Sequence, residues 1–168
     1  MDNIYLIGMM GSGKSVVGKE LAKKLNMNHI DIDNDIEFIN EMKISDIFIY
    51  SGEKKFREME SAYFMEKSKQ ENNIFSTGGG IILREENRLV LKNNGITFFL
   101  EADCQILLDR IKDISNRPLL LKNNPLDDVL SIWKKRKKYY HESSHHTINS
   151  NQLSISDVIN EIVEKLNK

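Results

Sequence analysis

The segment that most constrains this chain is a glycine-rich loop near its start, GMMGSGKS, which runs from Gly8 to Ser15. It fits the pattern G-x-x-x-x-G-K-[ST], in which glycines permit a tight turn whose backbone N–H groups surround phosphate oxygens. An apolar segment at 4–7, expected to be a strand, precedes the loop, and an apolar stripe of helical period starts at Val17. A strand entering such a loop and a helix leaving it, with its positive dipole end toward the anion, predict a nucleoside triphosphate site.

Two side chains of the loop have the chemistry that a nucleotide requires. The Lys14 ammonium would act in catalysis at the β- and γ-phosphates, and the Ser15 hydroxyl would ligate Mg²⁺. The nucleotide-binding residues expected here are Gly11, Ser12, Gly13, Lys14, Ser15 and Val16. The alternative is a glycine-rich turn that holds no ligand, and the loop alone leaves the phosphate acceptor open.

Beyond the loop, short apolar segments alternate with longer segments of helical period, which is the pattern of a parallel sheet with crossover helices. The expected strands are 3–7, 29–32, 73–76, 96–100 and 147–149. Helical stripes run through Val17, Leu21 and Leu25, through Phe56, Met59 and Tyr63, and through Ile155, Val158, Ile159, Ile162, Val163 and Leu166. No repeat or linker divides the 168 residues, so one α/β domain over 1–168 is expected.

Composition narrows the class of function. With 24 basic and 25 acidic residues the formal charge is −1, whereas proteins that bind nucleic acid by charge show a basic excess. The single cysteine, Cys104, excludes an intrachain disulfide and fits a reducing compartment. No apolar run approaches the ~20 residues of a membrane helix, and no signal peptide is recognisable. A soluble, cytoplasmic protein with no nucleic-acid or membrane partner is therefore expected. As a separate expectation, the protein is a monomer.

Two carboxylates come at the end of the second expected strand, at Asp31 and Asp33. Strand alternation would place both on one side, at the edge of the sheet where ligands bind in parallel α/β folds. One carboxylate could then hold Mg²⁺ through water, and the other could accept a hydrogen bond from an acceptor hydroxyl. The alternative is that Asp33 or Asn34 caps the next helix, with Glu37 in its first turn.

Arg57 and a run of glycines form a second group of candidates. The glycines at 78–80 follow the third expected strand directly, and their lack of side chains would let a ligand approach the backbone closely. They could instead form a flexible turn before the next helix. Arg57 could bind an anion, or it could pair on its own helix with Glu53 at i−4 and Glu60 at i+3.

Together these motifs make the chain resemble the shikimate kinase family, from residue 4 to about 148. The motifs that carry the resemblance are the phosphate loop, Asp31-x-Asp33-x-x-Ile36-Glu37, Phe48-x-x-x-Gly52-Glu53-x-x-Phe56-Arg57-x-x-Glu60, Thr77-Gly78-Gly79-Gly80 and Arg117-Pro118-Leu119-Leu120. The resemblance implies a three-layer fold like that of nucleoside monophosphate kinases, with a five-stranded parallel sheet in the order 2-3-1-4-5. It also implies Mg²⁺-dependent transfer of phosphate from ATP to the 3-hydroxyl of shikimate, in the pathway to chorismate and aromatic amino acids.

The resemblance further implies roles for individual residues. Asp33 would bind the ring hydroxyls and act in catalysis, and Asp31 would help to hold Mg²⁺ through water. Arg117, in a lid over about 113–124, would act in catalysis at the phosphates, and Arg110 would lie near the adenine. The implied substrate-binding set, largely within the region 33–62, is Asp33, Phe48, Phe56, Arg57, Gly78, Gly79, Gly80 and Arg136.

The chain departs from the family's pattern at two places. Val16 stands where the family usually has threonine, which removes a hydroxyl near the α-phosphate. Around Arg136 the family's usual proline is replaced within a run of basic residues at 134–138. A stripe through Leu126, Val129, Leu130, Trp133 and Tyr140 centres nearer to Lys137 than to Arg136. A guanidinium fits a carboxylate better than an ammonium does, so Arg136 is the expected ligand.

Two other functions remain open at this stage. One is a gluconate or nucleoside monophosphate kinase on the same fold, because fold alone does not determine the substrate. The other is a nucleotide-binding module without catalysis. The set of Asp33, Arg57 and 78–80 suits a hydroxylated acid better than a base, and Lys14 and Ser15 argue against a silent module.

Overall fold

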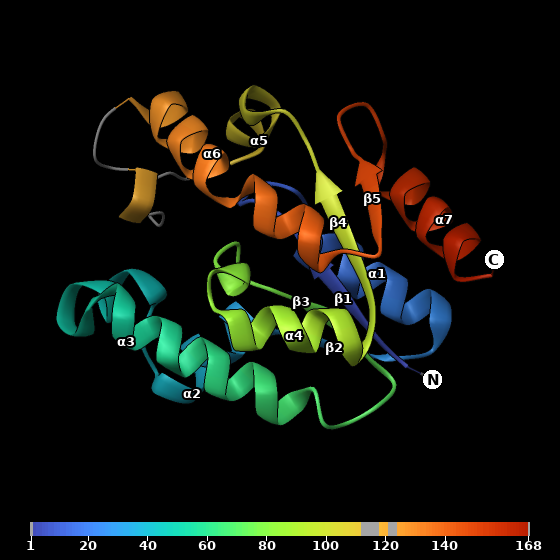
Figure 1. Cartoon of the computed structure of the whole chain (residues 1–168), viewed down its shortest axis with the longest axis horizontal. Coiled ribbons are helices and arrows are strands. Elements are labelled where there is room, and N and C mark those ends of the chain that lie inside the picture. Colours follow the sequence, from blue (N-terminus) through green and yellow to red (C-terminus); the bar gives the residue numbers. More distant parts are fainter. Residues whose placement is uncertain (1, 112–117, 121–123, 168) are drawn as a thin grey trace.

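The computed structural model describes residues 2–111, 118–120 and 124–167. It has one sheet of five parallel strands in the order β2-β3-β1-β4-β5, with helices on both faces (Figure 1). The strands are β1 (Asn3–Ile7), β2 (Asn28–Asp31), β3 (Asn73–Ser76), β4 (Gly95–Glu101) and β5 (His146–Asn149). The expected α/β class and strand order are thereby confirmed.

Helices connect successive strands as crossovers, and a last helix follows β5. They are α1 (Lys14–Leu25), α2 (Ile32–Asn40), α3 (Ile44–Lys67), α4 (Glu85–Asn93), α5 (Cys104–Arg110), α6 (Pro125–Ser143) and α7 (Ile155–Leu166), with 3₁₀ turns η1 (Ile81–Leu83) and η2 (Pro118–Leu120). No helix among these residues is long and apolar enough to cross a membrane.

Two apolar cores flank the sheet, because successive strand side chains point to opposite faces. On β1, Ile4 and Leu6 contribute to the core under α1 and α7, whereas Tyr5 and Ile7 contribute to the larger core under α3, α4 and α6. Val158, Ile159 and Ile162 bury the predicted stripe of α7, although Ile155 at its start is 46% exposed. A sheet covered on both faces presents its ligand site at the carboxyl ends of its strands.

The helix α3 is broken where the sequence places a glycine. Gly52 has φ 79° and ψ 162°, so residues 44–51 run in a different direction from residues 53–67. A left-handed φ of this kind favours glycine. The break lets Phe48 on the first part and Arg57 on the second line the same pocket.

Candidate active site

The phosphate loop joins β1 to α1, and its shape depends on three glycines with positive φ, a conformation that favours glycine. Gly8, Gly11 and Gly13 have φ of 148°, 79° and 88°. A Cβ on Gly8 would lie 2.6 Å from the carbonyl oxygen of Leu100, and one on Gly11 would lie 2.4 Å from that of Leu107. The loop is therefore fixed both by its own backbone and by close contact with the neighbouring segments.

Lys14, the first residue of α1, folds its side chain back into this loop. Its ammonium donates hydrogen bonds to the carbonyl oxygens of Gly8 (2.9 Å) and Met9 (2.8 Å) and to the Ser12 hydroxyl (3.2 Å). The neighbouring Ser15 lines the main pocket, and Val16 is half exposed on the first turn of α1. The charged group thus lies inside the turn where the motif predicts phosphate.

The two aspartates after β2 line the same pocket as Ser15, although not for the reason expected. The strand ends at Asp31 and α2 begins at Ile32, so strand alternation does not extend to Asp33. The expected helix cap was also wrong, because Asp31 itself caps α2, with its Oδ1 accepting a hydrogen bond from the backbone N–H of Asn34 at 3.2 Å. The first turn of α2 then brings Asp33 round to the pocket.

Arg57 is held at the pocket by two carboxylates of its own helix. Its Nη1 lies 2.8 Å from Oε2 of Glu60, and its Nη2 lies 3.2 Å from Oε1 of Glu53. The helix pairing expected as one alternative therefore occurs, and the paired guanidinium also lines the pocket, where an anion could reach it. Glu60 is fully buried, and this burial raises the pKa of its carboxyl even though Arg57 favours the charged form.

The glycines at 78–80 leave room for side chains of the site itself. A Cβ on Gly80 would lie 2.2 Å from Cζ of Arg57. A Cβ on Gly78 would lie 2.5 Å from Oε1 of Glu60 and 2.7 Å from Oδ1 of Asp33. The segment is a packed wall of the pocket that continues into η1, and the alternative of a loose turn before the next helix does not describe it.

Arg136 enters the pocket from α6. It is 6% exposed, and its Nη1 donates a hydrogen bond to the carbonyl oxygen of Gly79 at 3.0 Å. The Tyr140 hydroxyl donates to the same oxygen, and burial raises the pKa of Tyr140 to about 12. Lys137 is exposed instead, with its ammonium 5.6 Å from the centre of the Trp133 ring.

The inward seam of α6 differs from the predicted stripe. Leu130, a member of that stripe, is 45% exposed. The side that packs inward has alternating spacings of four and three residues, and its members are Val129, Trp133, Arg136, Tyr140 and Ser143. This spacing is that of a helix packed along one side, and it includes Arg136 and not Lys137.

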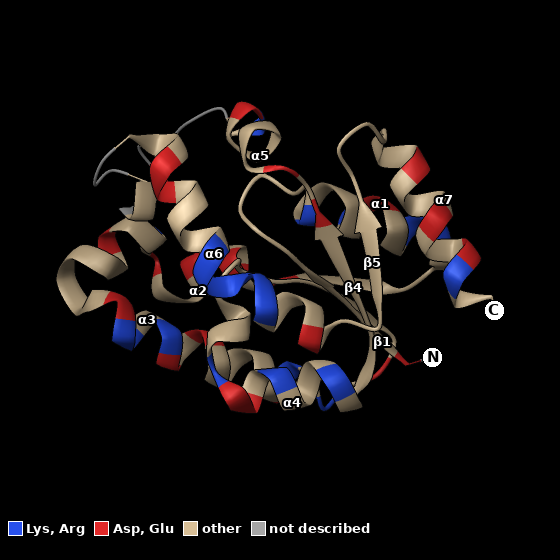
Figure 2. Ribbon diagram, turned by 45° about the horizontal axis from the view of Figure 1, so that its top comes forward, with Lys and Arg blue, Asp and Glu red and all other residues tan. Residues whose placement is uncertain are grey.

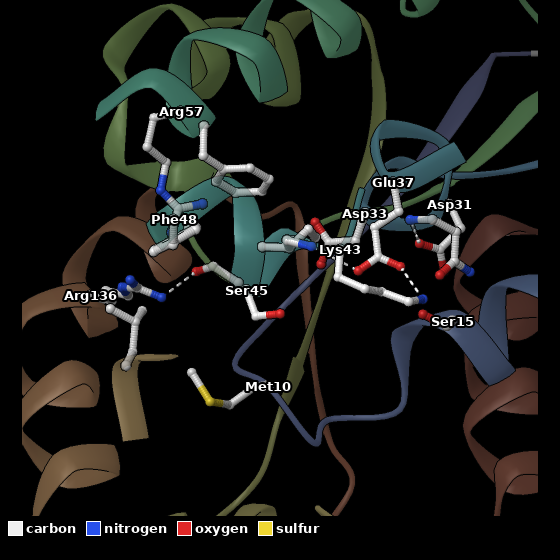
Figure 3. Close-up of a pocket in the computed structure, with 17 residues that line it drawn as sticks. Met10, Ser15, Asp31, Asp33, Glu37, Lys43, Ser45, Phe48, Arg57 and Arg136 are labelled. Atoms are coloured by element: carbon white, nitrogen blue, oxygen red, sulfur yellow. Dashed lines mark hydrogen bonds and ion pairs between the residues drawn. The ribbon is translucent and has the colours of Figure 1, made fainter. Parts of the chain in front are cut away.

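These groups surround one pocket of about 320 Å³ (Figure 3). Phe48 and Phe56 form an aromatic wall, with ring centroids 5.2 Å apart. At the rim, Lys43 forms an ion pair with Glu37 at 2.8 Å. Lining residues that were not among the expected site residues are Met10, Asn34, Glu37, Lys43, Ile44, Ser45 and Leu119. Several lie one or two positions from a motif residue, which is the signal that could have found them.

Of the two remaining arginines of the prediction, the structure describes one, Arg110, which does not line the pocket. Arg110, at the end of α5, donates from Nη2 to the carbonyl oxygen of Ser150 at 2.6 Å, which ties α5 to the segment after β5. Arg117 lies outside the described residues, as does most of the expected lid at 113–124. Figure 2 shows a basic stretch on α6 and charges of both signs on α3, α4 and α7.

Comparisons with known proteins show the family and the fold of the chain. The profile of the shikimate kinase family matches residues 10–167. A shikimate kinase of Bacillus cereus (strain AH187) is 40% identical over 168 residues, which is the full length of both chains. The structure of shikimate kinase from Acinetobacter baumannii in complex with shikimate has a TM-score of 0.96 and 35% identity, and the match covers 99% of this chain and 93% of the other.

A more distant structure shares the fold alone. Deoxyadenosine kinase from M. mycoides with bound dATP aligns with a TM-score of 0.67 and 19% identity over the full length of both chains. The same three-layer architecture therefore carries more than one acceptor, and the acceptor must be argued from the pocket.

Proposed function

The chain belongs to the shikimate kinase family, and from this we propose that it transfers the γ-phosphoryl group of ATP to the 3-hydroxyl of shikimate. The observation that carries the proposal is the pocket in which Ser15 and Asp33 lie together with two arginines, Arg57 and Arg136. A hydroxylated acid presents one end to the phosphate loop and its carboxylate to the guanidinium groups. The product, shikimate 3-phosphate, lies on the route to chorismate and the aromatic amino acids.

In the proposed reaction, Asp33 accepts a hydrogen bond from the 3-hydroxyl and takes its proton. The hydroxyl oxygen forms a new bond to the γ-phosphorus, and the bond from that phosphorus to the bridging oxygen of ADP breaks. The Lys14 ammonium stabilises the negative charge that builds up on the phosphate oxygens. Since phosphoryl transfer depends mainly on position and charge, the fixed loop and the fixed acceptor together supply most of the catalysis.

Magnesium is part of the proposal. Among the described residues no group of three or more His, Cys, Asp or Glu side chains could hold a metal ion by itself, so ligands from the nucleotide are required. Oδ2 of Asp31 is buried and accepts no hydrogen bond from the described residues, which suits a metal-bound water. Ser15 and Asp31 would hold the ion, and Mg²⁺ supplies charge neutralisation at the phosphates when bound.

The carboxylate end of the substrate is assigned to Arg57 and Arg136. Both are largely buried, and guanidinium groups bind carboxylates in a planar, bidentate manner. Phe48 and Phe56 would pack against the apolar face of the ring, and the backbone of 78–80 would approach its hydroxyls. This set suits an acid better than the base of a nucleotide.

Several finer assignments complete the proposal. Arg117 would reach the phosphates from a lid over 113–124, and Arg110 would lie beside the adenine, near the segment after β5. Binding through Gly11, Ser12, Gly13 and Val16 would use backbone N–H groups. The enzyme would work as a monomer in the cytoplasm, where its co-substrate ATP is abundant.

The decisive experiment is a coupled assay of ADP release with shikimate, gluconate and AMP tested in parallel. We expect turnover with shikimate and background rates with the other two. A preference for gluconate or AMP would replace the proposed acceptor with another one on the same fold. Nucleotide binding without turnover on any of the three would indicate a silent module.

A further inference from the structure

A buried hydroxyl outside the pocket ties the phosphate loop to the sheet. Ser76 is the last residue of β3 and is 1% exposed, and its hydroxyl donates a hydrogen bond to the backbone carbonyl oxygen of Lys14 at 2.9 Å. The contact joins residues 62 positions apart in the sequence. It fixes the first turn of α1, which carries Lys14 and Ser15, against the centre of the sheet.

His29 on β2 determines the direction of this contact. Its Nε2 lies 2.9 Å from Oγ of Ser76. Because the single hydroxyl hydrogen of Ser76 goes to the carbonyl of Lys14, the serine oxygen must accept from His29, and Nε2 therefore carries a hydrogen. The result is a directed chain of hydrogen bonds from β2 through β3 to α1.

Gly18 shows how closely this chain of hydrogen bonds is packed. It lies one turn after Lys14 on α1, and a Cβ at this position would lie 2.3 Å from Oγ of Ser76 and 2.8 Å from Nε2 of His29. Contacts this short do not occur, so any other residue at position 18 would displace the serine or the histidine. The glycine is required because the hydroxyl must pass beside the helix to reach its first carbonyl.

The next residue, Thr77, makes a matching contact to the strand that leads into the loop. Its Oγ1 donates to the carbonyl oxygen of Leu6 at 3.0 Å, two residues before Gly8. Ser76 and Thr77 therefore secure the end of β3 to both arms of the phosphate loop. The following residues, 78–80, form the wall of the acceptor pocket.

We propose that Ser76, oriented by His29, is a positioning residue that sets the phosphate loop in register with the acceptor pocket. It touches neither substrate. It holds the backbone of Lys14 and the N–H groups of the first turn of α1 at a fixed distance from 78–80, where the acceptor is bound. Displacements of about 1 Å lower rates strongly when catalysis depends on position. The inference rests on the proposed kinase function.

The test compares binding of MgADP with binding of shikimate, each measured alone by calorimetry on the full chain. Ser76→Ala should weaken MgADP about 3- to 10-fold, the effect of one neutral hydrogen bond, and leave shikimate affinity unchanged. His29→Leu should reproduce the loss. His29→Gln retains a donor at a similar distance from the backbone and should keep MgADP affinity near that of the wild type. The double variant His29→Leu with Ser76→Ala should bind MgADP as well as Ser76→Ala alone.

Ser61→Ala provides a matched control. Ser61 is also buried, and its hydroxyl accepts a hydrogen bond from Asn87 at 2.9 Å, between α3 and α4. The variant should lose thermal stability with no change in either affinity, which separates the loss of a buried hydroxyl from the loss of loop position.

Unchanged MgADP affinity in Ser76→Ala, or an equal loss of shikimate affinity, would overturn the proposal. If His29→Gln and His29→Leu had the same MgADP affinity, the claim that His29 orients Ser76 would be overturned. Because MgADP binding does not require an acceptor, these results stand apart from a failure of the proposed reaction, which the substrate panel reports.

Discussion

The two halves of the candidate site are built in opposite ways. The phosphate side is a continuous segment of eight residues, in which backbone groups and one lysine form the site. The acceptor side collects side chains from α2, α3 and α6 and the backbone of the glycines after β3. The first can be recognised from the sequence because its geometry is local. The second exists only after the chain has packed.

The two halves also differ in buried charge. On the acceptor side, Arg57 and Glu60 form an ion pair whose side chains are 11% and 1% exposed. Desolvation makes such a pair a weak source of stability, but removing one partner leaves an uncompensated charge, which costs ~3–5 kcal/mol. On the phosphate side the Lys14 ammonium is bound by backbone carbonyls. Substitutions on the phosphate side should therefore affect mainly the chemical step. Substitutions on the acceptor side should affect both substrate binding and folding.

The largest effect is expected on the phosphate side, from Lys14→Ala. Water cannot replace an ammonium that stabilises the transferred phosphoryl group, so turnover should fall by about two orders of magnitude or more. Steady-state assays of ADP release measure it, with thermal unfolding as the check on folding. Lys19→Ala, an exposed lysine on the same helix, is the control. Near-normal turnover of folded Lys14→Ala would refute the assignment of Lys14.

An effect of similar size is expected at the point where the two sides meet. Asp33→Asn removes the proton acceptor without changing the size of the side chain, and turnover should fall roughly 100-fold or more. The affinity for an ATP analogue, measured by calorimetry, should stay nearly the same. An equal loss of nucleotide affinity would assign Asp33 to metal binding or to the structure of α2.

On the acceptor side, Arg136→Ala and Arg57→Ala should weaken shikimate binding. Each loses charge-assisted hydrogen bonds worth about 1.5–3 kcal/mol, which corresponds to roughly 10- to 100-fold in Kd. ATP binding should change little in both variants. Arg57→Ala should also unfold at a lower temperature, because Glu60 then lacks its partner.

Lys137→Ala is the control for these two arginines, since Lys137 is exposed and stacks on Trp133. A loss of shikimate affinity in Lys137→Ala but not in Arg136→Ala would mean that Lys137 is the ligand. If neither Arg57 nor Arg136 mattered, the acceptor would not be a carboxylic acid.

The smallest effect is a pH dependence of stability that arises from Glu60 on the acceptor side. Burial raises the pKa of Glu60, so protonated Glu60 is more favourable in the folded chain than in the unfolded chain at the same pH. The stability that this provides is complete below the ordinary pKa of the carboxyl and is lost as pH rises through the raised value. Chemical denaturation from pH 4 to 8 should therefore show wild type losing stability relative to Glu60→Gln as pH increases. A constant difference between the two proteins would contradict the raised pKa.

The contrast between a local phosphate site and an assembled acceptor site also explains which features can be predicted from the sequence. The boundaries of β1 and β3 agree with the expected strands, because apolar runs and glycines are local signals. At the end of β2 the strand pattern did not predict the N-cap of α2, because Asp31 is both the last residue of the strand and the cap of the helix. On α6, Leu130 resembles a core residue, but the helix packs inward along the side that holds Val129 and Arg136. Periodicity alone cannot choose between neighbouring faces when a charged residue lies on the inner one.

Some features of the site have no local signal at all. Gly80 and Gly18 are needed because side chains distant in sequence occupy the space beside them. The burial of Glu60 and the contact between His29 and Ser76 likewise depend on which elements become neighbours. Such requirements can be read only from the packed chain, so residue patterns alone predict candidates on the acceptor side but not how they come together.

The way in which Lys14 is held has a consequence for competition between anions. Any anion that recruits the ammonium must first replace its hydrogen bonds to Gly8, Met9 and Ser12. A nucleotide does so with several phosphate groups that also bind the surrounding N–H groups. Inorganic phosphate must break the same bonds with one group. We therefore expect the loop to favour anions with several linked phosphates and inorganic phosphate to be a poor competitor for ATP.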